Sequence, residues 1–478
     1  MKMAKRLLAL ALSVLMLVSL VGCGEDKPAN NGEIVTLRML MGFANQADTD
    51  MVLAEANKIA EKEIGVRLDI EWIDGSAYPQ QMKMNMASGD DYDICFTGYS
   101  NKYLDAVRNG GLYDITELLE ETPDLKKAVP QYVWDMATVD GKIYGVPNVQ
   151  GFAPKRSILV PKRFVDKYNF DMDSITHVEQ IEPYLEVIKQ NEPDMFAWTN
   201  GSTLWMYDKC EEITSGIYIS ADADKENHKV VHKLDLPEWV RAQEVQHEWY
   251  KKGYLRQDLL SYSYEDSELA KVVFKDNGWL PGSDVSTSQK AGETIIVKPL
   301  VNTILTKSLG LSTLLSVGAN SKYPLESLKM IELLNTNKEF YNLIINGIEG
   351  VHYETLEDGK IRPIPDSGYA PNVDWAFGNQ FNALIKEGQD DDVWEQTEKM
   401  NEEAVKSPLL AFTLDTEPIK TEISQISAIN QEYEAELFIV EGLDSPSVAE
   451  YRKKLEAAGL QKVMDEVQRQ VDAFFDAQ

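Results

Sequence analysis

The sequence predicts a secreted α/β protein that is built from two lobes. Its first 22 residues have the layout of a signal peptide, with basic residues at positions 2, 5 and 6 and an apolar segment from Leu7 to Leu20. Residues 34–96 then alternate between short apolar strands and amphipathic helices, which is typical of an open α/β sheet. Roughly 450 residues follow the leader, which is too long a chain for one hydrophobic core.

The leader ends on Leu20-Val21-Gly22-Cys23, which resembles the lipobox of bacterial lipoproteins. The resemblance implies cleavage before Cys23, acyl chains on its thiol, and attachment to the outer face of the cell membrane. The apolar segment is short for a membrane span, which needs ~20 residues. The alternative is an ordinary signal peptide in which Cys23 is incidental. Residues 24–33 are polar and predict a flexible tether between the anchor and the folded chain.

The chain is strongly acidic. It has 47 Lys and Arg against 78 Asp and Glu, a net charge of −31, and the basic leader makes the mature chain still more negative. Such a field repels nucleic acid, so no nucleic-acid partner is expected, and it favours neutral ligands. Cys95 and Cys210 are the other two cysteines. They fall in different predicted lobes, so we expect two buried thiols rather than a disulfide.

The first predicted sheet also predicts where a ligand would bind. Its elements, in order, are strand 34–41, helix 48–64 with Gly65 as its stop, strand 66–72, helix 77–87 and strand 92–96. In open α/β sheets, ligands bind beyond the carboxyl ends of the strands. The turns at 42–44 and 97–100 are therefore the predicted ligand side, whereas Trp72 and Trp134 are predicted to be structural.

The rest of the chain continues the alternation of strands and helices. Asp140-Gly141 predicts a hairpin turn. Further predicted elements are strand 158–160, helix 177–190, an aromatic turn-rich stretch at 196–205, helix 236–252, strands 272–275, 278–280, 295–305 and 314–317, helices 324–335 and 339–347, and two amphipathic helices within 451–475 that Gly459 separates.

Three segments, in this order, resemble the sugar-binding class of extracellular solute-binding proteins of ABC importers. They are YDICFTG at 92–98, NGGLYDITELLE at 109–120 and VWDMATVDGKIYGVP at 133–147. Segments 347–353, 374–383, 411–424 and 451–475 resemble a narrower branch, the longer solute-binding lipoproteins of Gram-positive bacteria with a C-terminal domain of unknown function. The resemblance covers essentially all of the mature chain.

The resemblance implies a two-lobed, periplasmic-binding-protein-like (Venus-flytrap) fold with hinge crossovers and C-terminal helices. It implies lobe 1 at 34–148 with 302–365, and lobe 2 at 149–301 with 366–478. The implied function is capture of a carbohydrate, most simply an oligosaccharide, by hinge closure, and its delivery to ABC permease subunits in the membrane. The implied protein is a monomer without a cofactor.

The sequence contains no strong catalytic motif, so we expect no enzyme. Carboxylates are too plentiful to single out a glycosidase pair. His228 and His232 are predicted to lie in a solvated loop rather than in a metal site. A secreted glycoside hydrolase and a ligand-binding partner of a surface sensor or adhesin stay open as alternatives.

Sugars are bound by flat aromatic rings against their C–H faces and by polar side chains against their hydroxyls. The resemblance places Trp375 as a stacking residue of the second lobe and either Trp205 or Trp198 as another, with core packing as the alternative for each. The remaining candidates are Tyr99, Ser100, Phe43 and Asn45 on the ligand-side turns, and Asn379 or Gln380 beside Trp375.

Four basic residues stand close together in sequence near the first expected crossover. They are Lys155, Arg156, Lys162 and Arg163. Such a cluster would suit the carboxylate of an acidic oligosaccharide. The alternative is a solvated basic face.

Overall fold

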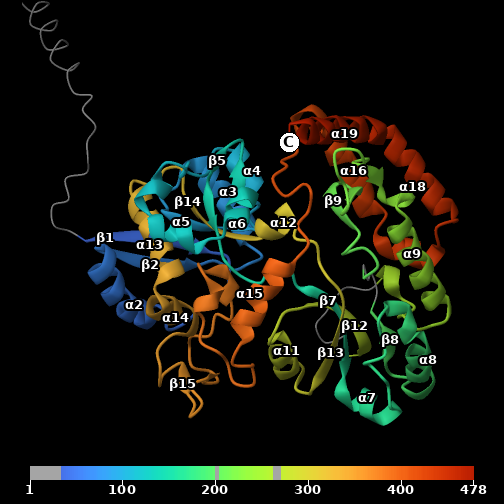
Figure 1. The fold of residues 1–478 in the computed structure, drawn as a ribbon, viewed down its shortest axis with the longest axis horizontal. Coiled ribbons are helices and arrows are strands. Elements are labelled where there is room, and N and C mark those ends of the chain that lie inside the picture. The colour runs from blue at the N-terminus through green and yellow to red at the C-terminus, as the bar shows by residue number, and fades with distance from the viewer. Residues whose placement is uncertain (1–33, 200–203, 262–270, 478) are drawn as a thin grey trace, which may run out of the picture.

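The computed structural model describes residues 34–199, 204–261 and 271–477. The predicted signal peptide, Cys23 and the tether lie outside the described residues. Two lobes stand side by side in Figure 1, and each contains its own sheet. Buried side chains form two separate core clusters, one in each lobe.

Lobe 1 is built on a five-stranded sheet with the strand order β2-β1-β3-β14-β6. Its strands are β1 (Val35–Met41), β2 (Val66–Trp72), β3 (Ile94–Gly98), β6 (Gly145–Pro147) and β14 (Thr313–Val317). β1 is parallel to both β2 and β3, and β14 is antiparallel to β3 and β6. The helices α2 (Thr49–Ile64) and α3 (Tyr78–Ser88) connect the parallel strands, so the predicted strand–helix alternation is confirmed.

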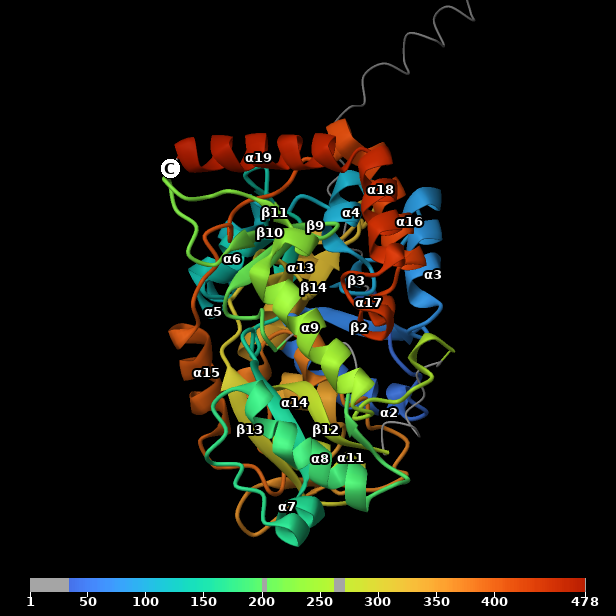
Figure 2. The same cartoon turned by 90° about the vertical axis from the view of Figure 1, so that its right-hand side faces the viewer.

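Helices cover the sheet of lobe 1 on both faces (Figures 1 and 2). They include α4 (Tyr103–Arg108), α5 (Pro123–Ala128), α6 (Gln131–Ala137), α13 (Pro324–Thr336) and α14 (Lys338–Asn346). Trp134 is buried in the core of this lobe, and Trp72 packs against that core, as predicted.

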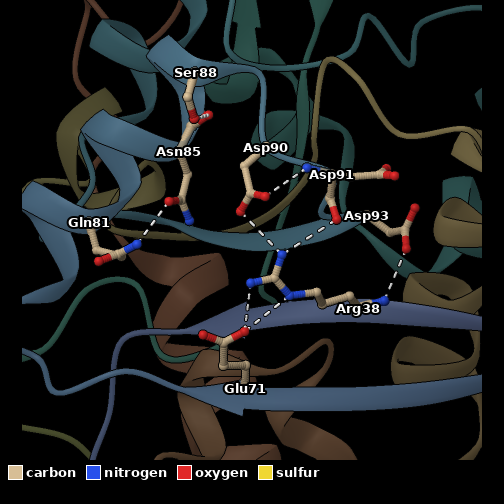
Figure 3. Close-up of polar contacts among 8 residues, drawn as sticks. All are labelled: Arg38, Glu71, Gln81, Asn85, Ser88, Asp90, Asp91 and Asp93. Atoms are coloured by element: carbon tan, nitrogen blue, oxygen red, sulfur yellow. Dashed lines mark hydrogen bonds and ion pairs between the residues drawn. The ribbon is translucent and has the colours of Figure 1, made fainter.

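Arg38, in the middle of β1, fixes the loop that leads from α3 into β3 (Figure 3). Its guanidinium donates to Glu71 on β2 at 2.7 Å and to Asp90 at 3.1 Å. Its backbone N–H donates to Asp93 at 3.0 Å, and Asp93 in turn accepts from Ser321 at 2.6 Å. The network therefore joins β1, β2 and the start of β3, and it holds the three parallel strands in register.

Lobe 2 contains a four-stranded sheet with the order β13-β7-β12-β8. These strands are β7 (Lys155–Pro161), β8 (Phe196–Trp198), β12 (Val272–Trp279) and β13 (Ile295–Val301), and β7 is antiparallel to both β12 and β13. A small sheet adds β9 (Cys210–Thr214), β10 (Ile217–Ser220) and β11 (Val231–His232). The packed helices are α7 (Lys162–Tyr168), α8 (Glu182–Asn191), α9 (Pro237–Lys251) and α11 (Ser283–Ala291).

The C-terminal helices form one side of lobe 2 (Figure 2). They are α16 (Lys420–Glu432), α17 (Ala435–Glu441), α18 (Pro446–Ala457) and α19 (Leu460–Asp476). One face of α19 buries Val463, Val467 and Val471 in the core of lobe 2. Gly459 separates α18 from α19 in the left-handed conformation, with φ of 90°, so the two predicted amphipathic helices and their break are confirmed.

Three segments cross between the lobes, at 148–154, 302–306 and 404–408, and we call them the crossing segments. They are bonded to one another: Leu305 N–H donates to the Val405 carbonyl at 2.8 Å, and Ser407 N–H donates to the Leu305 carbonyl at 2.9 Å. The hydroxyl of Thr303 donates to the carbonyl of Pro154. The crossing segments therefore form a continuous strip of backbone between the lobes.

The structure differs from the expected boundary at residue 366. Residues 373–383 pack in the core of lobe 1, and α15 (Val393–Glu403) follows on the same lobe through Trp394. Hydrogen bonds with α13 and α14 hold this segment: the Tyr341 side chain of α14 donates to the Asp374 carbonyl at 2.8 Å, and the Asn382 side chain of the segment donates to the backbone carbonyl of Asn335 on α13 at 2.8 Å. The segment consists of short 3₁₀ turns without apolar periodicity, so sequence pattern gave no sign of which lobe it joins.

Candidate ligand-binding site

An aromatic cluster lies at the carboxyl ends of β1 and β3. It consists of Phe43, Phe96, Tyr99 and Trp375, and we call it the aromatic cluster. Trp375 lies at the centre, with ring centroids 5.5 Å from Phe43, 6.3 Å from Phe96 and 5.9 Å from Tyr99. Three of the residues chosen from sequence, Phe43, Tyr99 and Trp375, are therefore brought together.

The aromatic cluster is open to solvent on one side. Phe96 is fully buried and supports the other rings from below, whereas Tyr99 is 57% exposed. Phe43 and Trp375 are partly buried. Desolvation raises the pKa of the Tyr99 phenol, which keeps its hydroxyl protonated and able to donate. An exposed ring on a rigid aromatic base offers a stacking face together with a hydrogen-bond donor.

A glycine at the end of β3 sets the direction of Tyr99. Gly98 has a φ of 143°, and a Cβ on it would lie 2.0 Å from the Ser312 carbonyl oxygen. The turn is closed by Gly98 N–H donating to the Asn101 carbonyl at 2.8 Å and by Tyr99 N–H donating to the Ser312 carbonyl at 2.9 Å. Only glycine fits this approach of β3 to the segment before β14.

Trp375 reaches the aromatic cluster from lobe 1, whereas the sequence analysis placed it in lobe 2. It lies in a 3₁₀ turn, Asp374–Ala376, on the segment that packs against the core of lobe 1. Asn379 caps the next turn by accepting from Phe381 N–H at 3.0 Å, and it lies beside Val149 of the first crossing segment. Gln380 donates to the Asp374 carboxylate at 3.2 Å. Asn379 and Gln380 therefore position the Trp375 turn.

Polar side chains without protein partners lie in the segments that follow β3 and β6. The Ser100 hydroxyl and the Asn101 amide nitrogen are buried and have no hydrogen-bond partner among the described residues. The same holds for both side-chain polar atoms of Asn148, at the start of the first crossing segment. Asn45 is exposed. Sequence reasoning singled out Ser100 and Asn45 but missed Asn101, three residues after the end of β3, and Asn148, which directly follows β6.

Trp198 and Trp205 belong to the core of lobe 2 and not to a surface. They are 1% and 8% exposed, and their ring centroids lie 5.4 and 6.2 Å from that of Trp249 on α9. Trp205 also donates to the Glu179 carboxylate at 3.0 Å. Both tryptophans are therefore core residues, which was the alternative to ligand binding, and neither is a candidate ligand residue any longer.

The four basic residues near the first crossing segment do not form one site. Lys155 and Arg156 begin β7, while Lys162 and Arg163 lie on α7 beyond its other end, about 20 Å away at ~3.3 Å per residue. Three of them pair with separate carboxylates: Arg156 with Asp276 at 2.6 Å, Lys162 with Asp166 at 2.6 Å, and Arg163 with Glu293 at 3.1 Å. The four side chains therefore do not converge on one bound carboxylate.

The two histidines predicted to lie in a solvated loop are largely buried. His232 is buried within β11, and the His228 ring stacks on Phe475 of α19 with centroids 4.7 Å apart. The prediction of a solvated loop is therefore wrong, because the C-terminal helix covers this segment. Within the described ranges, no group of three or more His, Cys, Asp or Glu side chains is arranged to hold a metal ion.

Both described cysteines are free and buried, one in each lobe, as predicted. Burial raises the pKa of the Cys95 and Cys210 thiols to about 12, so both stay protonated. None of the helices within the described residues is long and apolar enough to cross a membrane.

Comparison with known proteins identifies relatives over the whole length of the chain. A family model described as "Domain of unknown function (DUF3502)" matches residues 408–476, the part that follows the third crossing segment. A "Carbohydrate ABC transporter substrate-binding protein" of Streptococcus pneumoniae is 29% identical over 476 residues, which cover 96% of each chain. "Lipoprotein LipO" of Bacillus subtilis is 21% identical over 200 residues, 40% of this chain and 38% of that protein.

Solved structures agree with the sequence relatives. The N-glycan transport solute binding protein NgtS of Streptococcus pneumoniae, 27% identical, matches with a TM-score of 0.83 over 92% of this chain and 99% of that one. Structures of NgtS in complex with Man1GlcNAc and Man5GlcNAc match with TM-scores of 0.75 and 0.72 at 28% identity, over 92% and 93% of this chain and 99% of each of those chains. The family and the two-lobed fold inferred from the motifs are confirmed: the chain is a substrate-binding protein of the carbohydrate ABC-transporter type and carries a DUF3502 domain at its C-terminal end.

Proposed function

We propose that the chain captures an oligosaccharide between its lobes, with the aromatic cluster of lobe 1 as the stacking platform, and hands it to a membrane permease. The observation that carries this proposal is the position of the cluster. In the sheet of lobe 1, Gly98 at the end of β3 pairs with Thr313, and Pro147 at the end of β6 pairs with Leu314. The edge that carries the cluster is thus the edge from which crossing segments lead to lobe 2.

Closure of the lobes on the ligand is supported by the three NgtS structures. One protein gives all three, so its falling TM-scores, from 0.83 to 0.75 and 0.72, reflect differences in its shape. The present chain has its highest TM-score with the NgtS structure whose description names no sugar. A ligand that contacts both lobes stabilises the closed arrangement by its differential affinity for that state.

The unpaired polar atoms near the cluster are the groups that would meet sugar hydroxyls. Ser100, Asn101 and Asn148 offer hydroxyl and amide groups, which suit neutral sugars. The basic residues nearest the first crossing segment converge on no common point. We therefore propose a neutral oligosaccharide as the ligand, the class to which the mannose-containing glycans bound by NgtS belong.

The anchor and the transport partner complete the proposal. Cys23 carries acyl chains that hold the protein on the extracellular face of the cell membrane, and the polar tether of residues 24–33 lets the lobes reach a permease. The LipO match and the lipobox-like sequence support the anchor. We propose that the protein acts as a monomer.

Thermal unfolding of the chain from residue 24 onward, with a panel of neutral and uronic-acid oligosaccharides, tests the binding function. A ligand at 100 times its Kd stabilises by about 2.7 kcal/mol, which is a measurable shift. We expect a neutral oligosaccharide to raise the Tm and to be recovered intact. The proposal would be contradicted if no neutral oligosaccharide raised the Tm, or if the bound sugar were cleaved.

Variants then test the site. Trp375→Ala and Tyr99→Ala should abolish the shift, while Tyr353→Ala, on the hairpin of Tyr353–Thr355 with Ile361–Pro363 and outside the aromatic cluster, serves as the aromatic control. A shift that survives both cluster variants would move the ligand elsewhere on the molecule. Cys23→Ser, which removes the thiol that would carry the acyl chains, should release the protein from the membrane fraction if Cys23 is the anchor.

A further inference from the structure

A pocket lies among the crossing segments, apart from the aromatic cluster. Its volume is about 360 Å³, and we call it the hinge pocket. Each of the three crossing segments contributes to its wall, through Ala153, Thr303 and Ala404. None of the residues of the aromatic cluster lines it.

Both lobes also contribute to the hinge pocket. Trp279 at the end of β12 comes from lobe 2, and Met400 on α15 comes from lobe 1. The lobes touch beside it, because a Cβ on Gly282 would lie 2.8 Å from a methyl group of Val393. A rotation of the lobes about the crossing segments therefore changes the distance between the walls of the pocket.

The chemistry of the hinge pocket differs from that of the aromatic cluster. Trp279 and Met400 supply an apolar wall, and Lys155 is the direct cross-strand partner of Trp279. Lys155 forms no ion pair with any described residue, whereas Arg156 beside it is paired with Asp276. Lys399 adds a second ammonium group, 3.7 Å from the Glu403 carboxylate. In a chain of net charge −31, this pocket has more cationic than anionic groups.

An indole beside a free ammonium group suits a sugar ring that carries a carboxylate. The C–H face of the ring packs on Trp279, and the carboxylate pairs with Lys155 in a charge-assisted hydrogen bond. The amides of Asn302 and Gln396 are placed in the same pocket to meet hydroxyl groups. A neutral sugar would leave the ammonium group of Lys155 without a counter-charge.

We propose that the hinge pocket binds a small carboxylate-bearing sugar, of the uronic-acid class, and that its occupancy changes the affinity of the main site for its oligosaccharide. The coupling follows from geometry, because a ligand that touches both lobes binds the open and closed arrangements unequally. Linkage then requires each ligand to change the affinity of the other by the same factor. The coupling rests on the proposed function, whereas binding at the hinge pocket does not.

Calorimetric titration of the chain from residue 24 onward with D-glucuronate tests the binding. We expect binding to weaken at least tenfold in Lys155→Gln and in Trp279→Leu. It should be unchanged in Lys162→Gln, the matched lysine control on α7, and in Trp375→Ala, which alters only the aromatic cluster. D-glucose, which lacks the carboxylate, should give no heat that depends on Lys155.

The outcomes separate the two sites. No binding of glucuronate, or binding that Lys155→Gln leaves intact, overturns the hinge pocket and leaves the proposed function standing. Glucuronate binding that is lost in Trp375→Ala would assign glucuronate to the aromatic cluster and would also overturn the hinge-pocket proposal. Lys155→Gln changes a single half-buried side chain, so it carries the test by itself if Trp279→Leu does not fold.

The coupling is tested with the oligosaccharide found in the thermal screen. Its Kd is measured with and without saturating glucuronate, and we expect a change of about fivefold or more. The change should vanish in Lys155→Gln. An oligosaccharide affinity that glucuronate does not alter would overturn the coupling even if glucuronate binds.

Discussion

The three tryptophans that were candidates for stacking on a sugar differ in their surroundings between the two lobes. Trp375 in lobe 1 joins an open cluster of rings at a strand-end edge, beside Tyr99, which is 57% exposed. Trp198 and Trp205 in lobe 2 are almost fully buried against Trp249. The difference lies in what covers each ring. Helix α9 covers the tryptophans of lobe 2, whereas Tyr99 keeps 57% of its surface exposed.

Replacing Trp198 should have the largest effect on stability. Trp198→Ala removes a fully buried indole and leaves a cavity beside Trp249, which costs about 3–5 kcal/mol. Trp375→Ala, which removes a partly buried ring, should cost far less. Urea unfolding of the two variants gives the comparison. A Trp198→Ala protein with native stability that fails to bind the oligosaccharide would return Trp198 to the binding site.

A buried histidine should make the stability of lobe 2 depend on pH. Burial lowers the pKa of His232 to about 4. The unfolded chain therefore takes up a proton on this histidine near pH 6.5, whereas the native state takes it up only near pH 4. Stability is therefore full above pH 6.5 and falls as the pH drops towards 4. At ~1.4 kcal/mol per pH unit, about 2 kcal/mol is lost between pH 6.5 and pH 5.

Denaturant titrations at pH 7.5 and pH 5 measure this loss. The difference in unfolding free energy between the two values should shrink in His232→Gln, which cannot take up the proton. His228→Gln on the same segment is the matched control. A pH dependence that is the same in His232→Gln and in the parent chain would show that other groups cause it.

Losing only the indole N–H of Trp205 should have a smaller effect. Trp205→Phe keeps a buried ring beside Trp249 but removes the hydrogen bond to Glu179. Glu179 keeps its two bonds from Arg241, so no carboxylate is left without a partner. The expected cost is about 1 kcal/mol, with no change in sugar affinity, and thermal unfolding with a parallel binding titration measures both. A loss of affinity would place Trp205 in contact with ligand.

The residues that were predictable from sequence are those set by local pattern. The strands and helices of residues 34–98 follow from apolar spacing and from glycine stops such as Gly65, and the ligand-side turns follow from the direction of the strands. Motifs of the family added the second lobe and the C-terminal helices. Phe43 and Tyr99 were therefore found together on one edge.

The residues that were misplaced depend on contacts between distant segments. The burial of Trp205 is set by α9, some 40 residues further along the chain, and the burial of His228 by α19, which comes about 240 residues later. The lobe that Trp375 joins is set by hydrogen bonds of its segment to the Tyr341 side chain on α14 and to the Asn335 carbonyl on α13. None of these contacts leaves a periodic trace in the sequence. Asn101 was missed because a lone asparagine in a turn carries no signal beyond turn formation.

Replacing Phe43 should have the smallest effect of the substitutions considered, and it tests directly whether the open cluster binds the sugar. Its ring packs edge-on against both Phe96 and Trp375, at 5.2 and 5.5 Å, so it supports the stacking ring from the side. Phe43→Ala removes contacts worth about 0.5–1.5 kcal/mol and leaves Trp375 free to turn, so oligosaccharide affinity should fall by several-fold, up to about tenfold. Phe43→Leu, which fills part of the space, should lose less.

Binding titrations of the Phe43 variants are best compared with those of a variant at the buried Phe170 in lobe 2. Phe170→Leu acts beside Tyr184, whose ring centroid lies 4.4 Å away, and it should lower the Tm without changing the affinity of the folded protein. If Phe43→Ala lowered only the Tm and left the affinity unchanged, the rings of lobe 1 would be as structural as those of lobe 2. The contrast between an open and a covered aromatic cluster would then have no functional meaning.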